Sequence, residues 1–232
     1  MIITIDGPGV SGKSTVARLL AEKLGFYYVS SGLLYRACAY LLLHKASYTM
    51  QDLAHTQQAD IERFLDPAQL RYTYDTFHKE QVCYQGVNIT SHLKTPEIDL
   101  ASSLISSIPL VRTKLMHMQR DIGMHHDIVI DGRDCGSVVF PQADSKFFLT
   151  ADLEVRAKRW VADQQKKAIT LDIAGARHEL QERDRRDLER KISPLVVPEG
   201  AIVIDSSALN RDQVLAMMER QVQDLVKSER ET

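Results

Sequence analysis

The chain has 232 residues, 29 Lys and Arg against 31 Asp and Glu, and 44% hydrophobic residues, which is ordinary for a globular protein and excludes general disorder. The formal net charge of −2 argues against a dedicated binder of nucleic-acid polymers. The longest apolar run, 37–43, is too short to span a membrane, and the start, with no basic residue, is unlike a signal peptide. We therefore expect a cytoplasmic protein without a membrane partner.

The first part of the chain alternates between strands and helices. Apolar runs at 2–5 and 26–29 predict buried strands. Between them, apolar residues at helical spacing predict a helix over 13–24 that ends at Gly25. Further helices are expected over 33–43 and 48–65. Residues 68–94 alternate between apolar and polar, with a turn at Gln85-Gly86, which predicts half-exposed antiparallel strands in a small inserted subdomain.

The second part continues the alternation. The start signals Thr95-Pro96-Glu97 and Pro109 predict two helices, the second running to about residue 122. Three more apolar strands and three more helices are expected over 128–130, 146–149 and 201–204, and over about 153–167, 171–190 and 210–226. Five short strands separated mainly by helices predict an α/β fold with a doubly wound, five-stranded parallel sheet. Ligands of such sheets bind beyond the carboxyl ends of the strands.

A phosphate-binding loop lies between the first predicted strand and helix. Residues 7–14 fit the pattern G-x-x-x-x-G-K-[ST] without a mismatch. Backbone N–H groups of such a loop surround the β-phosphate, the Lys13 ammonium neutralises phosphate oxygens, and the Ser14 hydroxyl suits Mg²⁺. The predicted ATP-binding residues here are Gly7, Pro8, Gly9, Val10, Ser11, Gly12, Lys13, Ser14 and Thr15.

Asp131 directly follows the predicted strand 128–130. A carboxylate there can hold the metal or its waters, and the alternative is an Asp that caps a helix. We predict Ser14 and Asp131 as the metal ligands.

The phosphate loop alone does not separate a kinase from a nucleotide-sensing switch. The guanine-reading Asn/Thr-Lys-x-Asp pattern of a GTPase is not found in the sequence. A phosphate acceptor is already an anionic nucleophile and mainly needs positive charge around it, and arginines stand at positions 36, 112, 133, 183, 186 and 190. A kinase for another acceptor, such as UMP or a hydroxyl compound, and a switch that binds a partner protein stay open.

Several motifs resemble those of the bacterial cytidylate kinases, which phosphorylate CMP and dCMP with ATP. The similarity runs nearly from end to end. Its most specific part is the run 131–141, Asp-Gly-Arg-Asp-Cys-Gly-Ser-Val-Val-Phe-Pro, supported by Ser31-Gly32-Leu33-Leu34-Tyr35-Arg36 and by Glu182 to Arg190. In one departure, Ser30 stands where the family usually has Asp.

The resemblance implies a role for each candidate residue. Arg36, Arg133 and Arg190 would hold the CMP phosphate; Ser103, Arg112 and Asp134 would read cytosine; Ser31 and Asp187 would complete the acceptor site, with Asp187 on the ribose. Two arginines of the lid, Arg156 and Arg159, would approach ATP. Two others, Arg183 and Arg186, would act with Lys13 and Arg133 in catalysis. It also implies a single P-loop kinase domain over 1–232, with an acceptor-binding insert at about 68–94, a lid at about 156–190, and a monomer using Mg²⁺.

Overall fold

The computed structural model describes residues 1–166 and 169–230. Its internal contacts divide the chain into two compact units: the first unit comprises residues 1–27 and 127–232, and the second unit comprises residues 28–126. Positions 167–168 and 231–232 lie outside the described residues. The predicted helix over 153–167 includes the first of these positions, and the predicted lid over 156–190 includes both 167 and 168.

The central sheet has the strand order β2-β6-β1-β7-β8. Its strands are β1 (Ile2–Asp6), β2 (Tyr27–Ser30), β6 (Ile128–Gly132), β7 (Ser145–Thr150) and β8 (Ile202–Asp205). β1 pairs in parallel with β6 and β7, and β7 pairs in parallel with β8. All five strands were expected from short apolar runs, and the predicted α/β fold with a five-stranded parallel sheet is confirmed.

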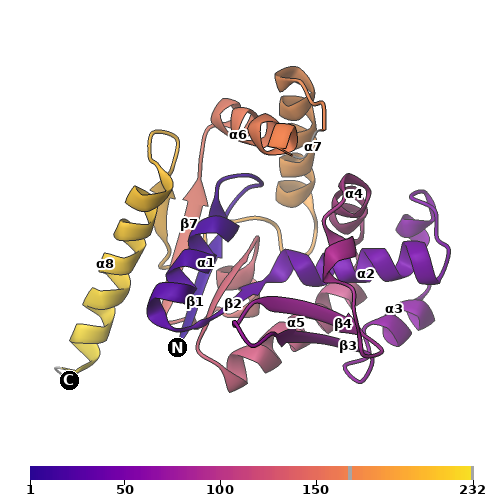
Figure 1. Ribbon diagram of the computed structural model, residues 1–232, viewed down its shortest axis with the longest axis horizontal. Helices are drawn as coiled ribbons and strands as arrows, with labels where there is room; N and C mark the ends of the chain where they lie inside the picture. Colours follow the sequence, from indigo (N-terminus) through magenta and orange to yellow (C-terminus); the bar gives the residue numbers. More distant parts are fainter. Residues whose placement is uncertain (167–168, 231–232) are drawn as a thin grey trace. The chain divides into compact units, whose positions relative to one another are not determined.

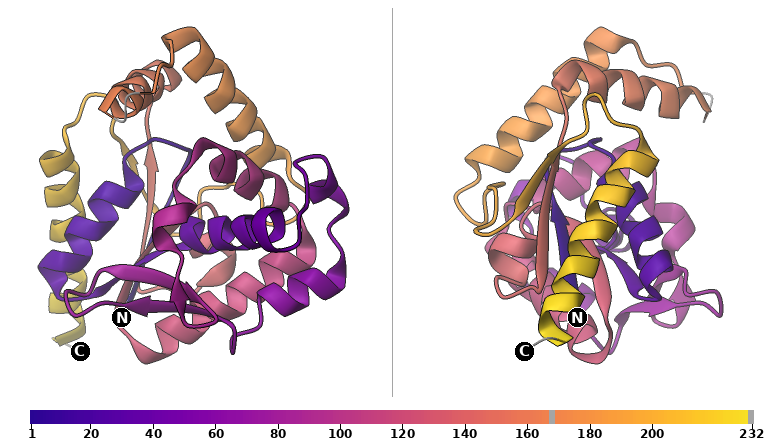
Figure 2. Two further views of the ribbon diagram at one scale, coloured as in Figure 1. Left: turned by 45° about the vertical axis from the view of Figure 1, so that its right-hand side comes forward. Right: turned by 90° about the vertical axis from the view of Figure 1, so that its left-hand side faces the viewer.

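Helices of the first unit lie around this sheet (Figure 1). α1 (Lys13–Leu24) contacts β6 and α8 (Arg211–Arg230). It ends at Gly25, whose φ of 70° only a residue without a Cβ adopts readily. α6 (Leu153–Lys166) and α7 (Ile173–Glu189) pack against each other, as both views of Figure 2 show. Their shared core contains Ala157, Ala176 and Leu180, with Trp160 against it.

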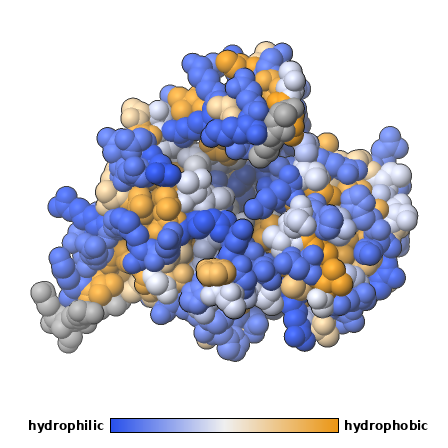
Figure 3. All heavy atoms as spheres, in the orientation of Figure 1, coloured by the Kyte–Doolittle hydropathy of each residue, from blue (hydrophilic) through white to orange (hydrophobic). Residues whose placement is uncertain are grey.

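The surface of the α6–α7 pair is mostly hydrophilic in the view of Figure 3, with some hydrophobic side chains among the charged ones. This agrees with the concentration of charge that the sequence places in both helices. Within residues 1–166 and 169–230, none of the helices combines the length and the apolar character that crossing a lipid bilayer requires.

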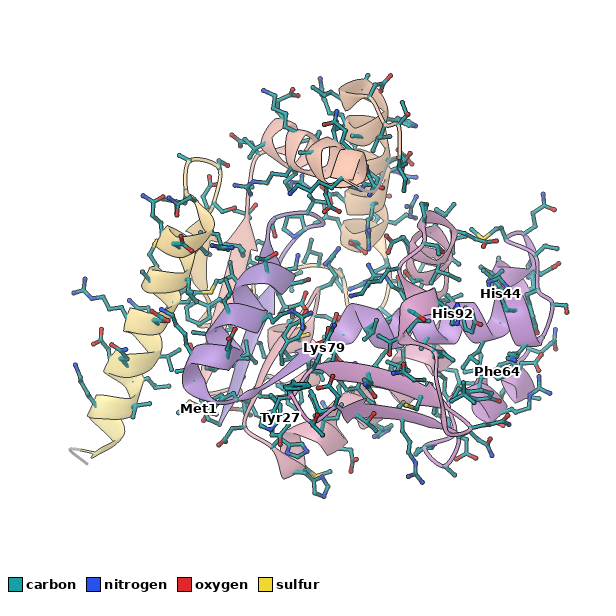
Figure 4. The ribbon with its side chains drawn as sticks, viewed as in Figure 1. Met1, Tyr27, His44, Phe64, Lys79 and His92 are labelled. Atoms are coloured by element: carbon teal, nitrogen blue, oxygen red, sulfur yellow. The ribbon has the colours of Figure 1, made fainter. Side chains whose placement is uncertain are left out.

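The second unit is built around a helix. α2 (Ser31–Lys45) contacts α3 (Gln58–Phe64), η2 (Thr90–Leu93), α4 (Pro96–Ile105) and α5 (Pro109–His125). η1 (Asp52–His55) belongs to the same buried core through Leu53. His44 and His92, labelled in Figure 4 with Phe64, both contact the ring of Tyr40. Thr95 caps α4 by accepting from the Ile98 N–H, as its start signal predicts.

A three-stranded antiparallel sheet completes the second unit. It consists of β3 (Leu70–Tyr74), β4 (Glu80–Tyr84) and β5 (Val87–Asn88). The predicted turn at Gln85-Gly86 joins β4 to β5, with φ of 50° and 80°, values that suit the tight turn of a hairpin. The antiparallel strands predicted for 68–94 are therefore confirmed.

The predicted helix over 48–65 is wrong. The segment contains only η1 and α3, separated by Thr56 and Gln57 in extended conformations with ψ of 130° and 138°. The polar side chains explain the break, because they bond the backbone locally. Asp52 accepts from the Thr49 N–H at 2.8 Å, and the Tyr48 hydroxyl accepts from the Gln57 N–H at 3.0 Å.

Candidate active site

The phosphate-binding loop lies between β1 and α1, the context that its sequence pattern requires (Figure 1). Gly7 has φ of 143°, and a Cβ there would be 2.1 Å from the Leu149 carbonyl oxygen. Gly12 has φ of 97° directly before α1. Because L side chains rarely adopt these conformations, both glycines are needed for the curl of the loop around an anion.

Lys13 folds back over the loop. Its side chain is buried, with 4% of the residue exposed, and its Nζ donates to the Pro8 carbonyl oxygen at 2.5 Å. Burial and the nearby Arg133 guanidinium hold the pKa of Lys13 well below its usual value, although the carboxylates of Asp131 and Asp6 oppose this. A poorly hydrated ammonium of this kind interacts strongly with phosphate.

Ser14 and Asp131 meet at the end of β6. The Ser14 hydroxyl donates to Asp131 Oδ2 at 2.7 Å. The two residues therefore offer hard oxygen atoms side by side, the chemistry that Mg²⁺ prefers when phosphate oxygens and water supply its other ligands. In the part of the chain that the structure describes, no group of three or more His, Cys, Asp or Glu forms an alternative metal site.

Four predicted acceptor residues form one cluster in the first unit. Arg133 Nε donates to Asp187 Oδ2 at 2.8 Å, Arg190 Nη1 lies 3.6 Å from Asp187 Oδ1, and Arg190 Nη2 lies 3.7 Å from Asp134 Oδ1. Burial would raise the pKa of Asp187, but Arg133 and the other arginines outweigh it and lower that pKa. Asp187 is therefore a carboxylate held by guanidinium groups, and Arg133 also lies near the phosphate loop, since a Cβ on Gly9 would be 3.5 Å from its Nη2.

Two of the four predicted lid arginines bond the phosphate loop, one directly and one through Ser206. Arg156 is buried and donates to the carbonyl oxygens of Ala151 and Gly9, and its Nη2 lies 2.7 Å from Asp184 Oδ2. Arg159 donates to Ser206, whose hydroxyl donates to the Ser11 carbonyl oxygen at 3.1 Å. Both side chains thus connect α6 with the loop through protein groups.

The other two lid arginines lie on α7. Arg183 is half-buried, and its Cδ would be 3.7 Å from a Cβ on Gly9, so its stem lies along the phosphate loop. Its charge also lowers the pKa of Lys13. Arg186 is half-buried on the same helix.

The remaining predicted acceptor residues belong to the second unit. Ser31 is buried at the start of α2, and Ser103 is half-buried on α4. Arg36 Nε donates to Asp99 Oδ1 at 2.6 Å. Arg112 is buried, donates to the Ser106 carbonyl oxygen at 2.9 Å and lies over the Tyr35 ring at 5.5 Å.

Sequence reasoning missed four residues that bind the predicted arginines or the backbone after Asp134. They are Asp99, which binds Arg36; Asp184, which binds Arg156; Ser206, which binds Arg159; and Asp6, which is fully buried and accepts from the backbone of residues 135 and 136. Asp6 had one signal in the sequence, since it ends a strand and directly precedes the phosphate loop.

A tyrosine of the three-stranded sheet holds the start of α2. Ser30 is the N-cap residue of α2, but its side chain makes no cap hydrogen bond. Its N–H instead donates to the Tyr72 hydroxyl at 2.9 Å, and the Tyr74 hydroxyl donates to the Tyr28 carbonyl oxygen at 3.2 Å. The sheet thus braces the turn that presents Ser31.

Tyr72→Phe removes the acceptor of the Ser30 N–H. We expect the free energy of unfolding to fall by about 1 kcal/mol, the usual net value of such a bond. Urea unfolding followed by circular dichroism measures the change. Tyr84→Phe is the control from the same sheet, where the ring packs edge-on against Phe64. Equal stability of the Tyr72→Phe variant and the unmodified chain would contradict the bracing role.

The glycine loop, the Ser14–Asp131 pair and the arginines of α7 define the class of P-loop kinases, enzymes that transfer a phosphoryl group from a nucleotide. A family model described as cytidylate kinase matches residues 3–224. The chain belongs to the cytidylate kinase family.

Relatives of similar length support this membership. The cytidylate kinase of Caldanaerobacter subterraneus subsp. tengcongensis is 37% identical over 227 residues, which cover 98% of this chain and 96% of the relative. That of Lactobacillus johnsonii is 34% identical over 223 residues, covering 96% and 94%. A crystal structure of an uncharacterized protein from Eubacterium ventriosum has a TM-score of 0.51 and 15% identity over 97% of this chain and 98% of its own, a likeness of fold alone.

Proposed function

We propose that the chain catalyses the reaction ATP + CMP → ADP + CDP and the corresponding reaction of dCMP. The observation that carries this proposal is the cluster of Arg133, Asp134, Asp187 and Arg190, because guanidinium groups that can bind a phosphate lie beside carboxylates that can accept from a base or a ribose hydroxyl. Arg133 also lies near the phosphate loop, where the donor phosphates would be bound. The family match over residues 3–224 supports the same acceptor.

Arg36, Arg133 and Arg190 would hold the acceptor phosphate. Planar guanidinium groups give charge and orientation together, and Asp187 would accept from a ribose hydroxyl. An oxygen of the CMP phosphate attacks the γ-phosphorus in line, and the bond to the β-γ bridging oxygen breaks as ADP leaves. Because the attacking oxygen is already anionic, the step needs no side-chain base.

The donor side would be served by the loop 7–15 and the lid. Lys13, Arg183 and Arg186 would neutralise charge on the transferring phosphoryl group, while Arg156 and Arg159 would support the ATP-binding loop. Ser14 and Asp131 fit the ligand set of a Mg²⁺ ion, which when bound would neutralise the β- and γ-phosphates.

Two further segments would exclude water. We propose that residues of about 156–190 act as a lid and that residues of about 68–94 cover the acceptor as an insert within one kinase domain. Closure would matter because water otherwise competes as the phosphoryl acceptor. Action as a cytoplasmic monomer is part of the same proposal, and the presence of cysteines as thiols, such as Cys38 and Cys83, fits a reducing compartment.

Asp134, with Ser103 and Arg112, would select cytosine. A carboxylate accepts from the exocyclic amino group of cytosine, whereas uracil presents a carbonyl oxygen at that position and two acceptors repel. Asp134→Asn supplies an amide that can face either base. We expect the CMP-to-UMP ratio of kcat/KM to fall by about tenfold. An unchanged ratio would show that Asp134 does not read the base.

A coupled ADP-release assay tests the function itself. CMP, dCMP, UMP, AMP and shikimate are offered as acceptors with ATP and Mg²⁺, and CMP or dCMP is expected to give the highest kcat/KM. A faster reaction with another acceptor would contradict the proposal. Nucleotide binding without acceptor-dependent turnover would instead favour a switch protein.

A further inference from the structure

The turn after Asp134 has an uncommon backbone. Residues Cys135–Val139 form the π-helical turn η3, in which the Phe140 N–H donates to the Cys135 carbonyl oxygen at 2.7 Å. Asp134 precedes it with φ of −146° and ψ of 22°, and its carbonyl oxygen accepts from the Val139 N–H at 3.1 Å. Single π-helical turns are rare and often lie at functional sites. Because Asp134 directly precedes this turn, the contacts that hold the turn also affect the position of Asp134.

Asp6 is the group that holds it. The residue ends β1 and is fully buried. Its Oδ1 accepts from the Cys135 N–H at 2.8 Å and its Oδ2 accepts from the Gly136 N–H at 2.6 Å. Hydrogen bonds from N–H groups to a carboxylate are stronger than bonds between neutral groups. One side chain thus binds the first two amides of the turn from a strand 129 and 130 residues away in the sequence.

The packing around Gly136 makes this approach close. A Cβ on Gly136 would lie 2.6 Å from Thr4 Oγ1 and 3.3 Å from Asp6 Oδ2. A larger residue at this position would therefore crowd the side chains of Thr4 and Asp6 and should disturb the contact between the turn and β1. The Asp6 carboxylate binds the turn, and the absence of a side chain at Gly136 allows the turn to lie close enough for this bond.

The buried environment of Asp6 disfavours the ionised form of its carboxyl group. Burial raises its pKa to about 6, even though both backbone N–H groups and Lys13 favour the ionised form. Asp134 is close enough to raise this pKa as well. The strand that carries Asp6 continues directly into Gly7 of the phosphate loop, and its register places Asp6 beside Gly132. Asp6 therefore connects the phosphate loop with both sides of the Arg133-Asp134 segment.

We infer that Asp6 is a positioning residue for acceptor specificity, which fixes the turn Cys135–Val139 and through it the Asp134 carboxylate that faces the base. This inference rests on the proposed function. In this role Asp6 acts through the backbone of Cys135 and Gly136, whose N–H groups it binds, and not by contact with the acceptor. The loss of either partner should therefore impair the choice of base more than the binding of ATP.

The experiment compares three variants with the unmodified chain. Asp6→Asn leaves one of the two N–H groups facing an amide NH₂. Gly136→Ala crowds the contact between Asp6 and the turn from the side of the turn and leaves the residue at position 6 unchanged. Asp144→Asn is the matched control, because its Oδ2 accepts from the Ile2 N–H at the other end of β1. For each, kcat and KM are measured with CMP, UMP and ATP, and amide exchange at residues 135 and 136 is followed by NMR.

Asp6→Asn and Gly136→Ala are expected to raise KM for CMP about tenfold and to lower the CMP-to-UMP ratio of kcat/KM similarly, with KM for ATP within about threefold. Exchange at residues 135 and 136 should accelerate in both, and Asp144→Asn should match the unmodified chain. If either variant fails to fold, the other decides. The inference would be overturned by a folded variant whose amides exchange faster but whose CMP-to-UMP ratio of kcat/KM is unchanged. In that case, CMP turnover by the unmodified chain would still support the proposed function. Absence of CMP turnover by the unmodified chain would overturn both.

Discussion

Lys13→Ala is expected to abolish CMP phosphorylation, with kcat falling by about 10³-fold or more. The Nζ is buried at the phosphate loop and donates to the Pro8 carbonyl oxygen. Its depressed pKa reflects poor hydration, so a phosphate oxygen would be a much better partner than the surroundings that it now has. Single-turnover measurements with saturating ATP and CMP would separate the loss of the chemical step from weaker binding.

Lys23→Ala is the control for this change. Lys23 lies on the same helix, is exposed, and pairs with Glu219 at 2.7 Å. Its removal should leave kcat within about twofold, because exposed ion pairs contribute little. If Lys13→Ala kept more than a tenth of the unmodified kcat, the assignment of the phosphate loop would be wrong.

Asp187→Ala is expected to lower the free energy of unfolding by about 3–5 kcal/mol, because it leaves two guanidinium groups without their shared carboxylate in a buried site. Arg133 and Arg190 both contact Asp187, and the side chains of Arg190 and Asp187 are only 4% and 8% exposed. Urea unfolding measures the loss. A double-mutant cycle with Arg133→Met isolates the coupling of the pair.

The pH dependence gives this prediction a second readout. The pKa of Asp187 lies below its ordinary value of 3.8 in the folded chain. The ionised carboxylate therefore contributes its stability above about pH 3.8, and the contribution is lost as the pH falls through the lower folded value. The stability difference between Asp187→Ala and the unmodified chain should be full at pH 7 and should narrow below pH 3.8.

Asp212→Ala on α8 is the surface control. Asp212 pairs with Arg211 at 3.0 Å, and both side chains are largely exposed. The expected change in the free energy of unfolding is about 0.5 kcal/mol or less. If Asp187→Ala were as mild as Asp212→Ala, the cluster would contribute nothing to the fold.

Local patterns predicted most elements, because the spacing of apolar residues and the start signals of helices are local properties of the sequence. The β-branched run before Gly7 forms β1, and Pro96 and Pro109 begin α4 and α5. The phosphate loop was also predictable, since its glycines encode a backbone shape and its Lys13 and Ser14 an anion and metal chemistry. The helix predicted over 48–65 was wrong because the side chains of Tyr48 and Asp52 bond the backbone there and interrupt the helix.

The pairings within the candidate site could not be predicted from the sequence. Asp187 is near Arg190 along α7, but its contact with Arg133 spans 54 residues, and the contact of Asp6 with Cys135 spans 129. Such pairs depend on which strands become neighbours. Periodicity also says nothing about η3, because a single π-helical turn depends on partners from outside the segment.

The arginines with carboxylate partners have a consequence for how the enzyme chooses among anions. Arg36 is paired with Asp99 and Arg133 with Asp187, so, under the acceptor roles proposed for these arginines, a phosphate would displace a carboxylate of the chain from each of them. These carboxylates act as tethered competitors. A singly charged solute such as chloride would gain little from the exchange, whereas a dianionic phosphate bound in a bidentate manner by a guanidinium group would gain more. If these arginines bind the acceptor, as proposed, ordinary salt should compete only weakly with it.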